Sequence, residues 1–279
     1  MILVDSHCHI HDLEYNFDIP KVLERATVNE VQKIIAIGTS PQDNLAAKAF
    51  AEKHENVFYS FGFHPSEPGS IDTVMEDFSD LIKSRRSEAR PRHSATTLQR
   101  QASATRSRVD EIEKSHNKLV AIGEIGLDYH YKPFDRKKQI KLLETMLDLA
   151  IKNNLPVIFH IREAFDDFFA ILRNFPNLKK AVVHSFSDDE PTLRKILETT
   201  DFYIGVNGLA TFAQIPLPPI EKMLLETDAP FLTPTPFRGK INEPAYIRSI
   251  ASFVADKNDI SLEQVAEITT RNVNKLFGI

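Results

Sequence analysis

The chain has 279 residues, a length typical of one α/β barrel, and its 42% hydrophobic and 26% charged residues suit a globular protein with a sizeable core. The formal net charge of −5 excludes a general attraction to polyanions, and a single cysteine excludes an internal disulfide framework. No apolar run reaches the roughly 18 residues that span a bilayer, and residues 1–5 lack the basic start of a signal peptide. We therefore expect a cytoplasmic protein that does not contact a membrane.

Short apolar runs alternate along the chain with longer amphipathic stretches, an order that favours βα units around a parallel sheet. The apolar runs predict strands near residues 2–6, 33–38, 57–62, 119–123, 156–160, 181–185, 202–206 and 223–227. The amphipathic stretches predict helices near 42–54, 134–153, 163–174, 190–199, 243–257 and 261–276. This alternation predicts a single (β/α)8 TIM barrel over residues 1–279, with an open doubly wound sheet as the alternative that the same periodicity allows.

Residues 84–108 break this pattern. They hold seven arginines against one acid, Glu88, and their only large aliphatic residue is Leu98. Without apolar surface to offset the entropy of ordering, we expect a flexible and dispensable insertion within the barrel. Its net charge of about +6 leaves about −11 on the rest of the chain. The alternative is a tethered arm that neutralises phosphates, although it lacks aromatic residues for stacking bases.

Candidate metal ligands stand on or at the ends of several predicted strands. His7 and His9 share one face of the first strand, because side chains alternate, so both imidazoles can bind one cation. Later strands end on further candidates, and in a barrel these ends converge on one mouth. Any one of these residues could simply cap its strand. Together they predict a centre for two divalent ions, with the ligands His7, His9, Glu124, His160, His184 and Asp228.

The motifs around these residues resemble those of a known family. They are His7-Cys8-His9, the stretches 123–129, 160–164 and 184–187, Glu226-Thr227-Asp228-Ala229-Pro230 and the stretch 238–244. In this order they resemble the TatD deoxyribonuclease family from residue 3 to 277, outside the insertion. The resemblance implies a barrel of the amidohydrolase superfamily and metal-dependent 3′-to-5′ exonuclease activity on DNA. It also implies that Glu124 is shared between two metals.

The sequence departs from the family pattern in three places. The usual His-Cys-Phe-Ser-Gly reads His184-Ser185-Phe186-Ser187-Asp188, which leaves the ligand intact. Residues 208–219 are shorter than the family's helical connection and contain three prolines, which puts in doubt a full helix after the seventh strand and the substrate-facing loop beside it. The arginine-rich insertion is foreign to the family.

Three residues are assigned catalytic roles. The hypothesis is that water activated by two ions attacks phosphorus and that Asp228, an oriented and ionised carboxylate, accepts its proton. Glu124 holds both ions by the family resemblance. His64, directly after the third strand, is a candidate phosphate contact or acid for the leaving group. A histidine that only caps its loop is the alternative for His64.

Three further residues are candidate substrate contacts. Arg162 shares the facing of His160 and could clamp phosphate through its planar guanidinium, or else form a salt bridge with a ligand carboxylate. Arg238 and Asn242 follow the eighth strand, where barrel enzymes often bind phosphate. Anchoring of their own loop is the alternative for these two residues.

Other polar residues receive milder assignments. Cys8 is expected in the core, and Asp128 is expected to tether the loop after the fourth strand. Asp5 either orients a ligand imidazole or makes a structural hydrogen bond. Four other histidines lack a converging partner in the sequence and are expected at the surface, namely His11, His54, His116 and His130.

The expected cofactors are two ions of Mg²⁺, Mn²⁺ or Zn²⁺, since mixed imidazole and carboxylate ligands suit several divalent metals. The expected partner is DNA, single-stranded or with frayed ends, and the expected state is a monomer. RNA and the opposite polarity remain open at this stage. Two alternatives remain: an amidohydrolase that cleaves an amide or another ester, and a non-enzymatic nucleic-acid-binding scaffold with residues 84–108 as its arm.

Overall fold

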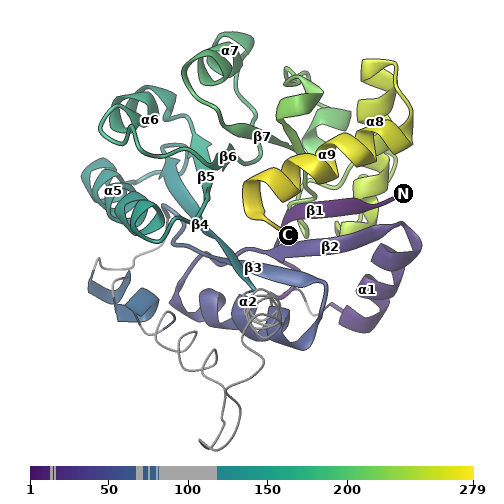
Figure 1. Ribbon diagram of the computed structural model, residues 1–279, viewed down its shortest axis with the longest axis horizontal. Helices are drawn as coiled ribbons and strands as arrows, with labels where there is room; N and C mark the ends of the chain where they lie inside the picture. The colour runs from purple at the N-terminus through teal and green to yellow at the C-terminus, as the bar shows by residue number, and fades with distance from the viewer. Residues whose placement is uncertain (13–14, 16, 67–71, 75, 80, 82–117) are drawn as a thin grey trace, which may run out of the picture.

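A computed structural model describes residues 1–12, 15, 17–66, 72–74, 76–79, 81 and 118–279. Eight parallel strands pair in chain order, as Figure 1 shows. They are β1 (Leu3–Cys8), β2 (Val31–Ala36), β3 (Val57–Phe61), β4 (Leu119–Asp128), β5 (Val157–Arg162), β6 (Ala181–Val183), β7 (Tyr203–Val206) and β8 (Met223–Leu225). All eight predicted strands are therefore present. The insertion predicted at 84–108 lies outside the described residues.

The barrel closes between its first and last strands. Cys8 and Ala229 form a parallel bridge just beyond β8. The amide of His9 donates to the carbonyl of Ala229 at 2.7 Å, and the amide of Asp228 donates to the carbonyl of His7 at 2.9 Å. These bonds join the ends of β1 and β8, so the fold is the predicted (β/α)8 TIM barrel and not an open sheet.

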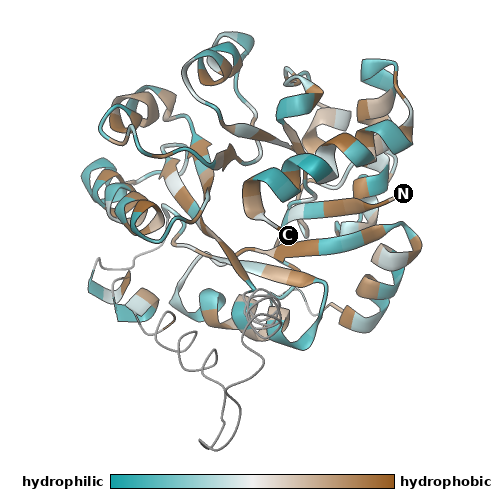
Figure 2. Cartoon of the chain, in the orientation of Figure 1, coloured by the Kyte–Doolittle hydropathy of each residue, from teal (hydrophilic) through white to brown (hydrophobic). Residues whose placement is uncertain are grey.

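Helices surround the barrel (Figure 1) and turn their apolar sides to the strands (Figure 2). They are α1 (Ile19–Val28), α2 (Pro41–Lys53), α5 (Arg136–Lys152), α6 (Phe165–Leu172), α7 (Glu190–Thr199), α8 (Ile247–Asn258) and α9 (Leu262–Phe277). Helix α1 was not predicted; it is only ten residues long and buries only Val22 and Ala26. Its start signal was nevertheless present, since the Asp18 side chain accepts from the amide of Lys21. Within the described residues, no helix is long and apolar enough to cross a membrane.

The connection between β7 and β8 is described throughout and holds no α-helix. It contains two short 3-10 segments, η2 (Gly208–Thr211) and η3 (Ile220–Lys222). This agrees with the doubt that its three prolines cast on a full helix. The predicted helix near 243–257 begins as a 3-10 turn, η4 (Pro244–Tyr246), and continues as α8.

The core has two parts. The larger part lies between the strands and the surrounding helices. The smaller part takes a residue from every strand and therefore fills the inside of the barrel. Val273, Leu276 and Phe277 of α9 belong to this inner part, so α9 closes one end of the barrel. The Thr270 hydroxyl donates to the carbonyl of Ile2 at 2.9 Å, which identifies the closed end as the one where the strands begin.

Two strands carry irregularities that redirect a side chain. On β1, Val4 packs inside the barrel and Cys8 packs outside, which strict alternation does not allow. The pairing register shifts between Asp5 and Cys8, and a second shift lies between Ile122 and Ile125 on β4. Such bulges re-aim side chains next to functional sites. They place His7 and Glu124 at the open end of the barrel.

Candidate metal centre

Six side chains converge at the open end, and all six were predicted as ligands. His7 lies on β1 with His9 directly after it, Glu124 lies on β4 and His160 on β5. His184 and Asp228 follow β6 and β8. The site is therefore assembled from five strands at their carboxyl ends, where TIM-barrel active sites are found. The structure brings the whole predicted set together.

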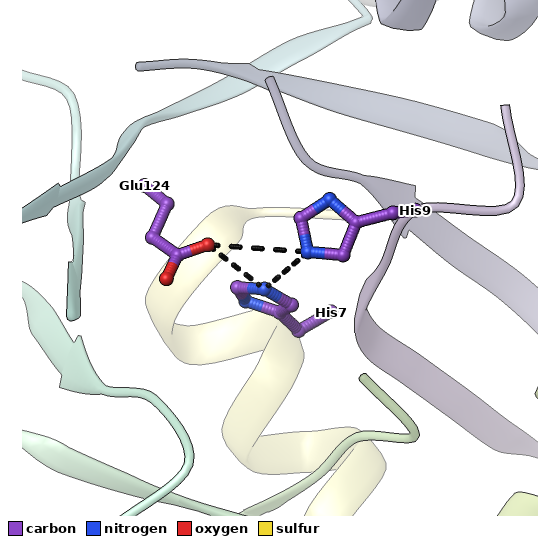
Figure 3. A group of neighbouring side chains, drawn as sticks. All are labelled: His7, His9 and Glu124. Atoms are coloured by element: carbon purple, nitrogen blue, oxygen red, sulfur yellow. Dashed lines mark hydrogen bonds and ion pairs between the residues drawn. The ribbon is translucent and has the colours of Figure 1, made fainter. Parts of the chain in front are cut away.

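Glu124 occupies the middle of the cluster and faces both sides of it. Its Oε2 lies 3.3 Å from His7 Nε2 and 3.9 Å from His9 Nε2. Figure 3 shows these three side chains pointing toward one another. Its Oε1 lies 2.7 Å from His160 Nδ1 and 3.6 Å from His184 Nε2. Each carboxylate oxygen thus faces its own pair of imidazoles.

Asp228 completes the first of these two groups. Its Oδ1 lies 3.6 Å from His7 Nε2 and 3.5 Å from His9 Nε2. Its backbone adopts a left-handed conformation with φ of 56°, which aspartate tolerates better than most residues. Because its amide is bonded to the carbonyl of His7, the carboxylate is held beside the first strand.

The donor set fits divalent metal ions. Candidate ligand atoms lie within 4.8 Å of one another in two groups that share Glu124: one adds His7 and His9, and the other adds His160 and His184. Nε2 of His7 and Nε2 of His9 lie only 3.2 Å apart. Imidazole and carboxylate are ligands of Zn²⁺ and of other divalent metals. Two neighbouring groups linked by one carboxylate match a pair of ions.

The pKa values of both carboxylates of the cluster are lowered, although little of either side chain is exposed. Burial alone would raise the pKa of Glu124, but His184, His160 and His7 hold this pKa well below its usual value. Burial likewise acts to raise the pKa of Asp228, and His184 and His9 lower it. Both groups therefore offer charged oxygen atoms to a cation at neutral pH.

Two imidazoles of the cluster differ in charge. Burial lowers the pKa of His7, and the charge of the neighbouring His184 lowers it further. Burial opposes protonation of His184 too, but Glu226, Glu124 and Asp228 raise its pKa to about 10. Without a metal, His184 therefore carries a proton that a bound ion must displace.

Two acidic residues orient candidate ligand histidines by accepting a hydrogen bond from the ring nitrogen that does not face Glu124. Asp128 Oδ2 accepts from His160 Nε2 at 3.0 Å, and Glu226 Oε1 accepts from His184 Nδ1 at 3.0 Å. These bonds leave His160 Nδ1 and His184 Nε2 free to face Glu124. Asp128 also accepts from the amide of His130 at 2.9 Å and so tethers its loop, as predicted.

The role of Glu226 was missed from the sequence. This residue is 1% exposed, and it also accepts from the amide of Ser185 at 2.7 Å. Its position directly after β8, where the strand ends at the mouth of the barrel, is the signal that could have identified it.

His64 lies at the edge of the cluster. Its Nε2 is 3.9 Å from Glu124 Oε1, and its ring packs edge-on against His160 at 4.4 Å. Burial and the neighbouring His160 lower its pKa to about 4, so the ring is neutral near pH 7. Nδ1 of His64 lies 2.7 Å from Ser66 Oγ. This geometry suits a neutral hydrogen-bond partner for phosphate better than an acid.

The three predicted substrate contacts fall in different places. Arg162 lines the cavity of about 980 Å³ above the cluster, and no described carboxylate forms a salt bridge with it. Arg238 is exposed, does not line this cavity, and donates to the carbonyl of Thr233 at 2.8 Å. Asn242 is fully buried, and its amide nitrogen donates to the carbonyls of Thr227 and Phe231. These contacts of Arg238 and Asn242 anchor their own loop.

Two predictions for residues outside the ligand set need correction or refinement. His11 was expected at the surface, but it is 5% exposed and its Nε2 lies 2.8 Å from Asp43 Oδ1. The partner, 32 residues away, could not be read from the sequence. Asp5 accepts from the amide and hydroxyl of Thr227, which is its structural alternative, and burial raises its pKa to about 7.

Among the other residues, Cys8 and His130 follow their expectations. Cys8 is buried, as predicted. His130 is exposed and pairs with Glu163, and His54 is half-buried against Phe50. His116 lies outside the described residues.

The TIM barrel and the cluster of histidines and carboxylates at its mouth define a metal-dependent hydrolase. The family model described as TatD related DNase matches residues 4–278, and the chain belongs to this family. A relative from Bacillus subtilis, an uncharacterized metal-dependent hydrolase named YabD, is 31% identical over the full length of both chains. A relative from Pantoea ananatis, named 3′-5′ ssDNA/RNA exonuclease TatD, is 30% identical over 99% of this chain and 100% of its own.

A solved structure agrees with the family. The Escherichia coli TatD homologue YJJV superposes with a TM-score of 0.80 at 26% identity, and the match covers 99% of this chain and 98% of that one. The predicted family and fold are therefore confirmed.

Proposed function

We propose that the protein hydrolyses phosphodiester bonds of DNA from the 3′ end, as a monomer that holds two divalent ions. One observation carries the proposal: Glu124 directs one oxygen to His7 and His9 and the other to His160 and His184. Such a two-ion centre suits in-line displacement at phosphorus. The name of the relative from Pantoea ananatis supports a nucleic-acid substrate.

When bound, two ions supply a lowered pKa for water and positive charge for the phosphate. Asp228 accepts the proton of the attacking water, because it is ionised and its side chain keeps 14% exposure toward the mouth. Arg162 is a planar donor for phosphate oxygens, and His64 donates a single N–H from its neutral ring. Asp128 and Glu226 keep the ligand imidazoles aligned throughout.

The test is hydrolysis of a short end-labelled single-stranded DNA. The protein is stripped with EDTA, and Mg²⁺, Mn²⁺ or Zn²⁺ is restored separately. We expect metal-restored cutting that is lost in His160→Ala and kept in His54→Ala, a matched control on a histidine outside the cluster. The product ladder shows which end is attacked. Bound metal without any cutting would contradict the proposal and favour an amide or another phosphoester.

The role of Asp228 has its own test. Asp228→Asn should lower turnover even when enough metal is added to restore the metal content of the parent protein, which atomic emission measures. Full turnover of this variant at unchanged metal occupancy would remove Asp228 as the proton acceptor.

A further inference from the structure

Apart from the proposed ions, the side chains of the cavity above the metal centre offer little positive charge to attract a nucleic acid. Among the described residues that line it, Arg162 is the only arginine or lysine. Asp12 and Asp43 line the same cavity, and the whole chain carries a net charge of −5. Electrostatic attraction supplies most non-specific binding to DNA. Contacts other than charge must therefore contribute to substrate affinity.

Two aromatic rings in the same cavity are unusually exposed. Tyr131 is 62% exposed and Phe231 is 48% exposed, and both line the cavity. Tyr131 follows β4 and Phe231 follows β8. Because the strands pair in the order β1 to β8, these two strands are four places apart in a closed ring of eight. The rings therefore lie on opposite sides of the mouth, with the metal centre between them.

Phe231 is held at a fixed position relative to the metal ligands. Its amide donates to the carbonyl of Asp228 at 2.8 Å, and its carbonyl accepts from the side chain of Asn242 at 2.5 Å. Its ring packs edge-on against His9 with a centroid distance of 6.4 Å. Asn242 thus acts on this side of the mouth through the backbone of Phe231.

Tyr131 is tied to the opposite side through Arg162. The guanidinium carbon of Arg162 lies 5.1 Å from the centre of the Tyr131 ring, which is a cation–π distance. The carbonyl of Arg162 accepts from the amide of Tyr129 at 3.0 Å, which joins the loop after β4 to the end of β5. A phosphate on Arg162 would therefore place its own nucleotide beside Tyr131.

We propose that Tyr131 and Phe231 stack the bases of the two nucleotides that flank the scissile phosphate, one base on each ring. The inference rests on the proposed function and assigns the two side chains that would hold unpaired terminal bases. Bases inside a duplex are already stacked on their neighbours, so a paired end would have to open first. Stacking is tolerant of sequence, because every base has a π-face.

The experiment compares short single strands that differ only in one base. One strand carries all its bases, a second is abasic at the 3′-terminal nucleotide, and a third is abasic at the penultimate one. Each is cut by the metal-loaded parent protein, Tyr131→Ala and Phe231→Ala. In the parent we expect each abasic site to raise KM about tenfold. Each alanine variant should raise KM on the complete strand and become insensitive to one abasic position, a different one for each ring.

Conservative variants and a control separate stacking from structural damage. Tyr131→Phe and Phe231→Tyr keep a ring and should keep the KM of the parent. Leu45→Ala removes an apolar side chain that is 70% exposed on α2, outside the cavity, and should change nothing. An equal rise in KM on complete and abasic strands in the alanine variants would overturn the inference.

The remaining outcomes separate this inference from the proposed function. If the parent cuts complete and abasic strands alike, stacking is wrong and the nuclease assignment stands. If the metal-loaded parent cuts none of them, the proposed function fails and the inference fails with it.

Discussion

The two ends of the barrel are built from opposite kinds of residue. At the end where the strands begin, Val273, Leu276 and Phe277 of α9 close the interior with apolar side chains. At the other end, four imidazoles and two carboxylates face one another at the edge of a cavity. The apolar end contributes burial, which stabilises the fold, and the polar end places charged groups close together at a cost in stability. Stability and chemistry are thus separated along the barrel axis.

The largest effect on the polar end is expected from Glu124→Gln. An amide cannot offer two charged oxygens, so both groups of ligands lose their common member. We expect turnover to fall by more than about 100-fold, beyond the range of residues that only orient ligands. Metal content and turnover are measured on the same sample. Two bound ions with near-normal turnover would show that Glu124 does not link the groups.

Smaller losses of metal affinity or turnover are expected from changes in the two carboxylates that bond His160 and His184. Asp128→Asn and Glu226→Gln keep the size of each side chain but weaken the hold on His160 and His184. We expect losses of about 10- to 100-fold in metal affinity or turnover. Titration of the EDTA-treated proteins with Zn²⁺ gives the affinity. Unchanged affinity and turnover in both variants would assign these carboxylates to folding alone.

The apolar end should respond in stability and not in chemistry. Leu276→Ala leaves a cavity inside the barrel, because this side chain is 2% exposed. The expected cost is about 2–5 kcal/mol of unfolding free energy, measured by urea denaturation. Turnover of the folded protein should stay near the parent value at low temperature. A large loss of turnover in fully folded protein would break the separation of the two ends.

Removal of the metal is expected to affect stability as well as chemistry, because ions bind the cluster only in the folded protein. At a free-metal concentration of 100 times Kd, one bound ion stabilises the fold by about 2.7 kcal/mol. EDTA should therefore lower the Tm, which calorimetry measures. The apparent metal affinity should also rise with pH. Since the pKa of His184 is raised to about 10, metal must displace its proton, and this becomes easier as pH increases. Affinity that falls as pH rises from 6 to 8 would contradict this sign.

The smallest effect is expected from deletion of residues 84–108. The segment carries about +6 of charge and contains none of the six predicted ligands. We expect most turnover on a short substrate to remain. Loss of DNA binding on deletion would instead support a scaffold with a basic arm.

The sequence was sufficient for the barrel and for the six side chains that converge at its mouth. Parallel strands read as short apolar runs, and a ligand at a strand end needs no long-range information to be located at the mouth. The sequence was not sufficient to identify the hydrogen-bond partners of the histidines. His184 and Glu226 are 42 residues apart, and His11 and Asp43 are 32 apart, so only the folded chain shows these pairs.

Local irregularity and burial were also beyond the sequence pattern. The register shifts on β1 and β4 re-aim His7 and Glu124, and strict alternation cannot describe them. Arg238 and Asn242 in the loop after β8 were predicted to contact substrate, but Asn242 is buried with its amide bonded to main-chain carbonyls. Polar residues in a loop look alike in sequence, whether they face the solvent or the interior.

For the two ions of the proposed centre, the shared carboxylate of Glu124 has a thermodynamic consequence. An ion bound beside His7 and His9 fixes the orientation of that carboxylate, and the second oxygen is then already placed for an ion beside His160 and His184. Occupancy of the two positions is therefore linked, and by reciprocity each ion changes the affinity for the other by the same factor. Titration of the stripped protein should accordingly be described by a cooperative isotherm rather than by two independent ones.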